Sequence, residues 1–101
     1  MIDVIASIRI RSGRREDFLR EFNALTPDVL AEDGCIAYAA TVDVDSGLEN
    51  QVRDEDIVTI VEKWASLAHL RAHLKAPHMS AYRERVKDIV EGVTLKVLQP
   101  A

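Results

Sequence analysis

Residues 57–82, IVTIVEKWASLAHLRAHLKAPHMSAY, contain a strand, a helix and a helix break in one run. The first five residues, IVTIV, are apolar or β-branched at every position, which is typical of a strand buried on both faces. A helix is expected over about residues 66–75, and Pro77 should end it because proline cannot continue the hydrogen-bonded turns. The expected apolar stripe of this helix consists of Leu67, Leu70 and Leu74.

Upstream of this run, the sequence predicts a strand, a helix and a second strand. Apolar side chains alternate along residues 2–11 and 35–44, as they do in strands with one buried face. The helix between them should be kinked or restarted at Pro27, and Gly34 suits its end because glycine tolerates the left-handed conformation. The apolar stripe of this helix consists of Phe18, Phe22, Leu25 and Val29. The apolar face of the second strand consists of Ile36, Tyr38, Ala40, Val42 and Val44.

Downstream of Pro77, the sequence predicts the second half of a bent helix and a final strand. An apolar stripe continues over residues 79–89, and Gly92 should end it. That stripe consists of Met79, Tyr82, Val86 and Ile89, and the final strand carries Val93, Leu95 and Val97. The order β-α-β-β-α-β predicts one domain over residues 1–101, a ferredoxin-like α+β sandwich with two helices on one face of four strands.

The helix-free face of such a sheet is bare in a monomer. Because the third strand is apolar on both faces, something should cover that face, and a second copy of the sheet is the simplest candidate. The sequence therefore predicts a homodimer.

The composition limits the possible classes of function. Of 101 residues, 48% are hydrophobic and 30% charged, and the net charge of -4 argues against nucleic-acid or anionic-membrane partners. No apolar run approaches the roughly 20 residues of a membrane span, and the first residues lack the charge order of a signal peptide. Cys35 is the single cysteine, which excludes a disulfide framework and a cysteine-rich metal site. A cytoplasmic protein is expected.

All three histidines lie within residues 69–78. His69 and His73 are four residues apart, a spacing compatible with metal binding, but no carboxylate lies between them as in HExxH. At about 100° per residue, His73 falls at the boundary between the leucine stripe and water, whereas His69 should be exposed. An imidazole beside an apolar cavity can accept a proton from an acidic small molecule, so His73 is the candidate base. The alternative is a boundary histidine without a role.

Five other side chains are candidates for the wall of a pocket. Glu62 and Trp64 share one face of the third strand, which therefore ends in a carboxylate and an indole. The alternatives are an ion pair for Glu62 and plain core packing for Trp64. Tyr38, Met79 and Tyr82 lie on apolar stripes, either as core residues or as a pocket wall. No GxSxG motif or phosphate-binding glycine loop occurs, so serine-based and phosphate-based chemistries find no support.

Residues 57–82 resemble the signature of the antibiotic biosynthesis monooxygenase family of dimeric α+β barrels. The resemblance extends to VIASIRIRSG (4–13), TPDVLAEDGCIAY (26–38) and LKVLQP (95–100), and within the family it is greatest for small bacterial quinol monooxygenases. It implies a homodimer with one pocket per subunit between helices and sheet. Such enzymes oxidise quinols or related polyphenols with O₂ and need no flavin, haem or metal. The residues that the resemblance implies are His73 as base, and Trp64, His78, Met79, Tyr82, Glu62 and Tyr38 as pocket residues.

Relatives with other activities leave alternatives open. The haem-degrading members of the family resemble this sequence but carry an iron-binding histidine where Arg83 stands, and arginine cannot ligate iron. Another relative isomerises a phosphorylated autoinducer breakdown product, for which Arg71, Arg83 and Arg85 could form a cationic site. Related barrels also serve as ligand-sensing domains, so a dimer that binds a small aromatic ligand without chemistry is a further alternative.

Overall fold

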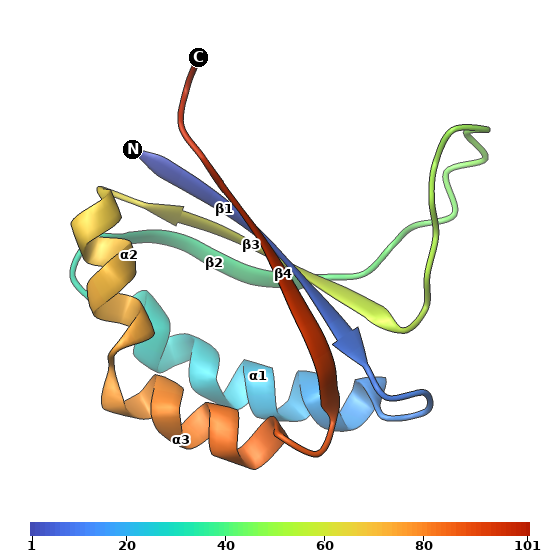
Figure 1. The fold of residues 1–101 in the computed structure, drawn as a ribbon, viewed down its shortest axis with the longest axis horizontal. Helices are drawn as coiled ribbons and strands as arrows, with labels where there is room; N and C mark the ends of the chain where they lie inside the picture. Colours follow the sequence, from blue (N-terminus) through green and yellow to red (C-terminus); the bar gives the residue numbers. More distant parts are fainter.

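The computed structural model describes residues 1–101 as a four-stranded sheet with three helices on one of its faces (Figure 1). The elements are β1 (Ile2–Ile10), α1 (Arg15–Leu30), β2 (Cys35–Thr41), β3 (Ile57–Trp64), α2 (Leu67–Leu74), α3 (Pro77–Val86) and β4 (Val90–Leu98). Neighbouring strands are antiparallel, and their order across the sheet is β2-β3-β1-β4. This order confirms the predicted ferredoxin-like α+β fold, with the second helix divided into α2 and α3. None of the three helices has the length and the apolar composition that a membrane-spanning helix requires.

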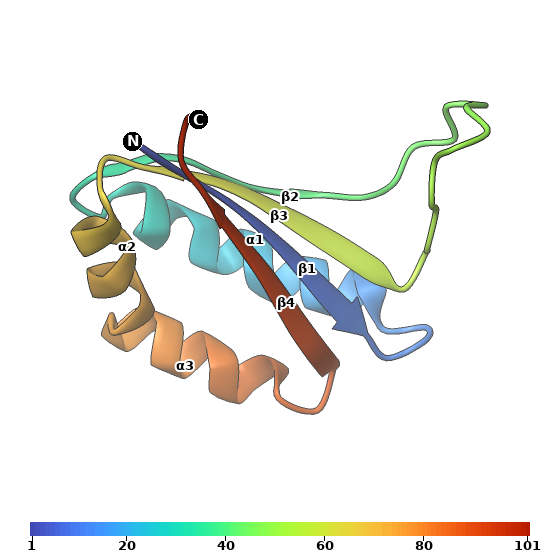
Figure 2. The same ribbon diagram turned by 45° about the horizontal axis from the view of Figure 1, so that its top comes forward.

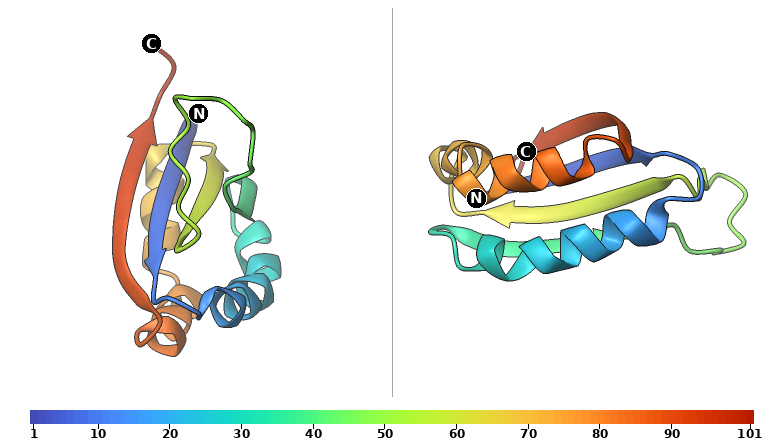
Figure 3. Two further views of the ribbon diagram at one scale, coloured as in Figure 1. Left: turned by 90° about the vertical axis from the view of Figure 1, so that its right-hand side faces the viewer. Right: turned by 90° about the horizontal axis from the view of Figure 1, so that it is seen from below.

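The helices divide the covered face of the sheet between them. α1 packs against β2 and α3, whereas α3 lies on the β4 side of the helical layer (Figures 2 and 3). The predicted apolar stripes of the first strand, the first helix and residues 79–89 all meet in this core. Their buried members are Val4, Ala6, Ile8, Ile10, Phe18, Phe22, Leu25, Val29, Met79, Tyr82, Val86 and Ile89.

The break between α2 and α3 has a local cause on each side. Ser66 caps α2, since its hydroxyl accepts a hydrogen bond from the backbone N–H of His69. Pro77 begins α3 at a position where a backbone N–H would have no partner in the helix. The predicted helix and its end before Pro77 are thereby confirmed.

The buried side of α2 differs from the predicted leucine stripe. Only Leu70 and His73 of this helix are buried, and Leu67 and Leu74 are exposed. The prediction is wrong for these two leucines because the two-turn helix makes its main sheet contact with β3 alone. Only one narrow side of α2 is therefore buried, and the imidazole of His73 forms part of that side.

Two details of the predicted elements differ in the structure: no second helix starts at Pro27, and β2 ends before residue 44. α1 runs through Pro27 without restarting, because the proline lies in the last turn of the helix, where few hydrogen bonds remain to be lost. β2 ends at Thr41, which is the last residue of β2 in register with β3, opposite Thr59. Val42 and Val44 therefore lie exposed in the loop over residues 42–56, which projects from the body of the molecule (Figure 1).

The two glycines that were expected to end helices have different roles. Gly34 has a φ of +79° in the turn after α1, as predicted for a left-handed residue. A Cβ atom at Gly34 would come within 2.3 Å of Cγ of His69, so the turn packs directly on α2. Gly92 does not end a helix, because β4 already begins at Val90 and Gly92 lies within that strand.

Apolar side chains remain uncovered on both faces of the sheet. Val61 is 41% exposed on the helix-free face, so the prediction that the third strand is buried on both faces is wrong for the single chain. On the helix side of β4, Val93, Leu95 and Val97 are 57%, 49% and 47% exposed, although their partners in β1 are buried. The helical layer does not extend over this edge strand.

Candidate active site

A cavity of about 470 Å³ lies between the sheet and the helices α2 and α3. The resemblance implied a pocket in this place. Most of its wall is apolar and includes Ala6, Ile8, Phe22, Ile60, Val86, Val90, Val93 and Leu95. Its polar lining consists of Tyr38, Glu62, His73, Tyr82, Arg83 and Lys87. Such a cavity suits an aromatic guest that presents hydroxyl groups to a few defined positions.

The side chain of His73 lies inside the core and not at its boundary. The residue is 2% exposed, and its ring lies between two aromatic side chains. The ring centroids of His73 and Trp64 are 4.6 Å apart, and those of His73 and Tyr38 are 5.5 Å apart. Trp64 itself is fully buried and does not line the cavity. Trp64 therefore packs against the imidazole without lining the cavity, whereas Tyr38 does both.

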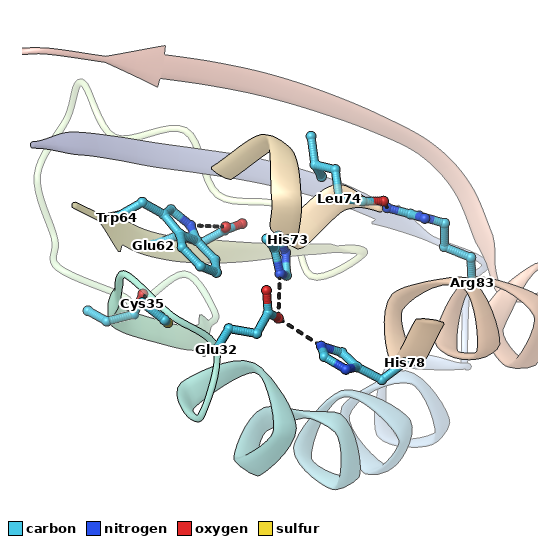
Figure 4. A network of polar contacts seen from close by, with 9 residues as sticks. Glu32, Cys35, Glu62, Trp64, His73, Leu74, His78 and Arg83 are labelled. Carbon is cyan, nitrogen blue, oxygen red and sulfur yellow. Dashed lines mark hydrogen bonds and ion pairs between the residues drawn. The ribbon is translucent and has the colours of Figure 1, made fainter. Parts of the chain in front are cut away.

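The two ring nitrogens of His73 face different surroundings. Nδ1 lies 2.8 Å from Oε2 of Glu32 (Figure 4). Burial lowers the pKa of His73 below its ordinary value of 6.5, although the Glu32 carboxylate opposes this effect, so the ring is neutral at pH 7. Because an ionised carboxylate only accepts hydrogen bonds, Nδ1 carries the proton and Nε2 keeps its lone pair. Nε2 has no hydrogen-bond partner in the protein. Because every fully buried side-chain nitrogen and oxygen does have a partner, Nε2 is not fully buried, and we place it at the cavity that His73 lines.

The sequence offers no pattern that predicts Glu32. This residue lies in the turn between α1 and β2, 41 positions from His73, outside every periodic stripe. The same oxygen, Oε2, also lies 2.7 Å from Nε2 of His78 (Figure 4). His78 therefore contacts Glu32 and does not line the cavity. The sequence did show that His73 and His78 lie close together along the chain, but not that one carboxylate joins them.

Glu62 lies against Trp64 and forms no ion pair. The indole Nε1–H donates a hydrogen bond of 3.0 Å to Oε1 of Glu62, and both residues are buried. Burial raises the pKa of Glu62, against the effect of this hydrogen bond. Its other oxygen lacks a partner in the protein and is therefore open to the cavity.

Tyr38, Met79 and Tyr82 are both core residues and cavity walls. All three are buried and line the cavity. Neither phenolic hydroxyl has a partner in the protein, so both are open to the cavity, and burial raises the pKa of both tyrosines. They therefore remain neutral hydrogen-bond donors at physiological pH.

The other basic residues do not converge on a metal or phosphate site. No group of three or more His, Cys, Asp or Glu side chains is arranged to hold a metal ion. His69 is half-buried against Gly34, with Nδ1 2.7 Å from the Ser66 hydroxyl. Arg83 lines the cavity, whereas Arg85 pairs with Glu21 and Arg71 lies outside the lining. Of the three arginines that could form a phosphate site, only Arg83 lines the cavity.

Comparisons with known proteins agree with this architecture. A family model described as antibiotic biosynthesis monooxygenase matches residues 1–85. "Probable quinol monooxygenase YgiN" of Escherichia coli K12 is 44% identical over 102 residues, covering 99% of this chain and 98% of its own. The structure of Rv0793 from Mycobacterium tuberculosis has a TM-score of 0.81 at 26% identity, covering 99% of this chain and 94% of that one. A conserved protein from Methanosarcina mazei Go1 has a TM-score of 0.84 at 18% identity, covering 99% and 92% respectively, which is a likeness of fold alone.

Proposed function

Because this chain belongs to the antibiotic biosynthesis monooxygenase family, we propose that it oxidises quinols or related polyphenols with O₂ and without a cofactor. The observation that carries the proposal is the unpaired Nε2 of His73, a neutral imidazole nitrogen at the wall of a largely apolar cavity. A base in that position meets the requirement for proton removal from a bound hydroxyl group.

Proton removal is the step that the protein must supply. When Nε2 of His73 takes a hydroxyl proton, the resulting quinolate is an electron-rich donor that reduces O₂ directly. One oxygen atom enters the ring as a hydroxyl group, and the other leaves as water with two hydrogens from the quinol. The products are a hydroxyquinone and water, so atoms and electrons balance without a further reductant.

The rest of the cavity suits this anion. The apolar wall formed by Phe22, Ile60 and Leu95 gives the ring an apolar surface to pack against. The hydroxyl groups of Tyr38 and Tyr82 donate hydrogen bonds to ring oxygens. Arg83, which has no acidic partner, places a positive charge at the cavity, where the quinolate forms.

We also propose that the protein acts as a homodimer. The helix side of β4 leaves Val93, Leu95 and Val97 about half exposed, and Val61 and Leu98 are exposed on the other face. Exposed apolar surface of this kind marks an interaction site. A second copy of this chain over β4 would also enclose the cavity, because Val93 and Leu95 line it.

The proposal is tested by oxygen uptake with a reduced naphthoquinol, using metal-free protein and a chelator. The native protein should consume O₂, and ¹⁸O₂ should place one labelled atom in the product. His73→Ala should lower turnover about tenfold or more, or about 1.4 kcal/mol of barrier. His69→Ala is the control, since that ring does not line the cavity.

Two outcomes would contradict the proposal. Equal turnover in native protein and His73→Ala would remove this histidine from the mechanism. Saturable binding of an aromatic ligand without oxygen uptake or product would favour a ligand-binding dimer, which the largely apolar cavity also suits.

A further inference from the structure

We propose that Glu32 is the positioning residue of the base and that His78 secures Glu32 in that role. The inference rests on the proposed function, because it concerns how His73 is kept ready to accept a proton. Glu32 lies in the turn between α1 and β2, and its side chain does not line the cavity.

The geometry shows one carboxylate oxygen shared by two imidazole rings. Oε2 of Glu32 lies 2.8 Å from Nδ1 of His73 and 2.7 Å from Nε2 of His78 (Figure 4). The Glu32 side chain is 13% exposed, so water competes little for this oxygen. Two donors from two helices therefore converge on the carboxylate, which fixes its position from both sides.

The contact determines which nitrogen of His73 is basic. A neutral imidazole can carry its proton on either nitrogen, and only the Nδ1–H form leaves a lone pair on Nε2 at the cavity. Glu32 selects that form, because its carboxylate can accept a hydrogen bond from Nδ1 but cannot donate one. When Nε2 takes the substrate proton, the same carboxylate stabilises the imidazolium ion in a buried place where it would otherwise be unfavourable.

The break at Pro77 explains how His78 reaches the same oxygen. His73 lies in the last turn of α2 and His78 in the first turn of α3, so the change of helix direction places the two rings on either side of Glu32. His78 is 28% exposed and does not line the cavity, which separates its role from substrate contact. Nε2 of His78 donates a second hydrogen bond to Oε2 of Glu32 and thereby limits rotation of the carboxylate.

The test combines NMR of ¹⁵N-labelled histidines with steady-state kinetics for Glu32→Gln and Glu32→Ala. In the native protein, the ring shifts of His73 should report the Nδ1–H form. Glu32→Ala should yield a mixture of both forms and lower kcat roughly tenfold or more, with KM changed by less than about twofold. Glu32→Gln should retain the Nδ1–H form, because the amide oxygen still accepts the hydrogen bond.

The pH dependence gives a readout that a merely structural role would not change. Because the pKa of His73 is already below 6.5, turnover should fall on the acid side only below that pH, as the base becomes protonated. Glu32→Gln removes the negative charge that favours the imidazolium ion, so the pKa of His73 should fall further. The acid limb of kcat should therefore move to lower pH. The other ionisable groups around His73 stay unchanged in this variant: Tyr38 of β2, Glu62 of β3, and His78 and Arg83 of α3.

Asp33→Asn is the matched control, because Asp33 lies in the same turn but contacts His69 instead, at 3.4 Å. It should leave the form of His73 and the acid limb as they are, while removing the same charge. An unchanged ring form in Glu32→Ala, with an unmoved acid limb in Glu32→Gln, would overturn the positioning role whatever the turnover. A different outcome is a changed ring form in Glu32→Ala together with full turnover in His73→Ala. This outcome would overturn the proposed function and still support Glu32 as the residue that determines which nitrogen of His73 carries the proton.

If Glu32→Ala fails to fold, the near-isosteric Glu32→Gln carries the test through its acid limb. His78→Gln and His78→Leu then examine the second half of the inference. The glutamine keeps a donor within reach of Oε2 and should preserve turnover better than the leucine, which removes the donor. Equal turnover in these two variants would overturn the role of His78.

Discussion

The two sides of the cavity are built differently. On the side of α2, β2 and β3, the rings of Trp64 and Tyr38 pack against His73, and the polar atoms are either paired or open to the cavity. On the side of β4, the wall residues Val93 and Leu95 are about half exposed. In one chain, therefore, the side that holds the proposed base is well packed, whereas the β4 side is open to solvent. In this molecule, different residues therefore hold the proposed base in place and border the open side of the cavity.

The difference in packing between the two sides should appear as a difference in the free energy of unfolding when one residue on each side is truncated. Trp64→Ala removes a fully buried indole and the donor to Glu62, so it should lower the free energy of unfolding by about 3–5 kcal/mol. Val93→Ala, on the exposed side, should cost less than about 1 kcal/mol. Urea denaturation followed by circular dichroism measures both. Similar losses would show that the two sides are equally well packed.

A smaller effect should come from the turn that carries Glu32. Gly34→Ala places a Cβ atom 2.3 Å from Cγ of His69 at a positive φ, so a loss of about 2 kcal/mol in the free energy of unfolding is expected. Gly13→Ala is a matched control, since Gly13 has a φ of +82° but nothing within 4 Å of the added atom, and should cost about 1 kcal/mol. Thermal unfolding compares the two. Equal losses would mean that the turn does not depend on its contact with α2.

The smallest effect on folding is expected from Val97→Lys on the open side. Because Val97 is 47% exposed and does not line the cavity, the free energy of unfolding of one chain should change by less than about 0.5 kcal/mol. The dissociation constant of the proposed homodimer should nevertheless rise about tenfold or more, which is about 1.4 kcal/mol. Sedimentation over a range of concentrations measures this change. Val52→Lys, in the exposed loop, is the control, and equal dissociation constants would place the interface elsewhere.

Repetitive patterns account for what the sequence predicts well. The buried stripes of β1 and α1 and that of residues 79–89 follow from apolar periodicity, and Pro77 marks the helix break. The same periodicity misleads at Leu67 and Leu74, because a two-turn helix against one strand buries only a narrow side. It misleads again at Val42 and Val44, where pairing between the strands ends first.

Long-range pairing accounts for what the sequence does not predict. Glu32 reaches His73 across 41 positions, and a single polar residue beside a turn glycine carries no sign of such a contact. The sequence predicts Trp64 as a pocket residue, whereas its ring packs against the imidazole of His73 and does not line the cavity. The apolar pattern of β4 predicts a buried face, but these side chains are about half exposed in the single chain.

The close packing of Trp64 against His73 has a practical consequence. The chain contains a single tryptophan, so its tryptophan fluorescence comes from one indole ring. That ring lies 4.6 Å from the imidazole, so a change in the charge on His73 should change its emission. The fluorescence of Trp64 should therefore report the charge on His73 without any label or substrate.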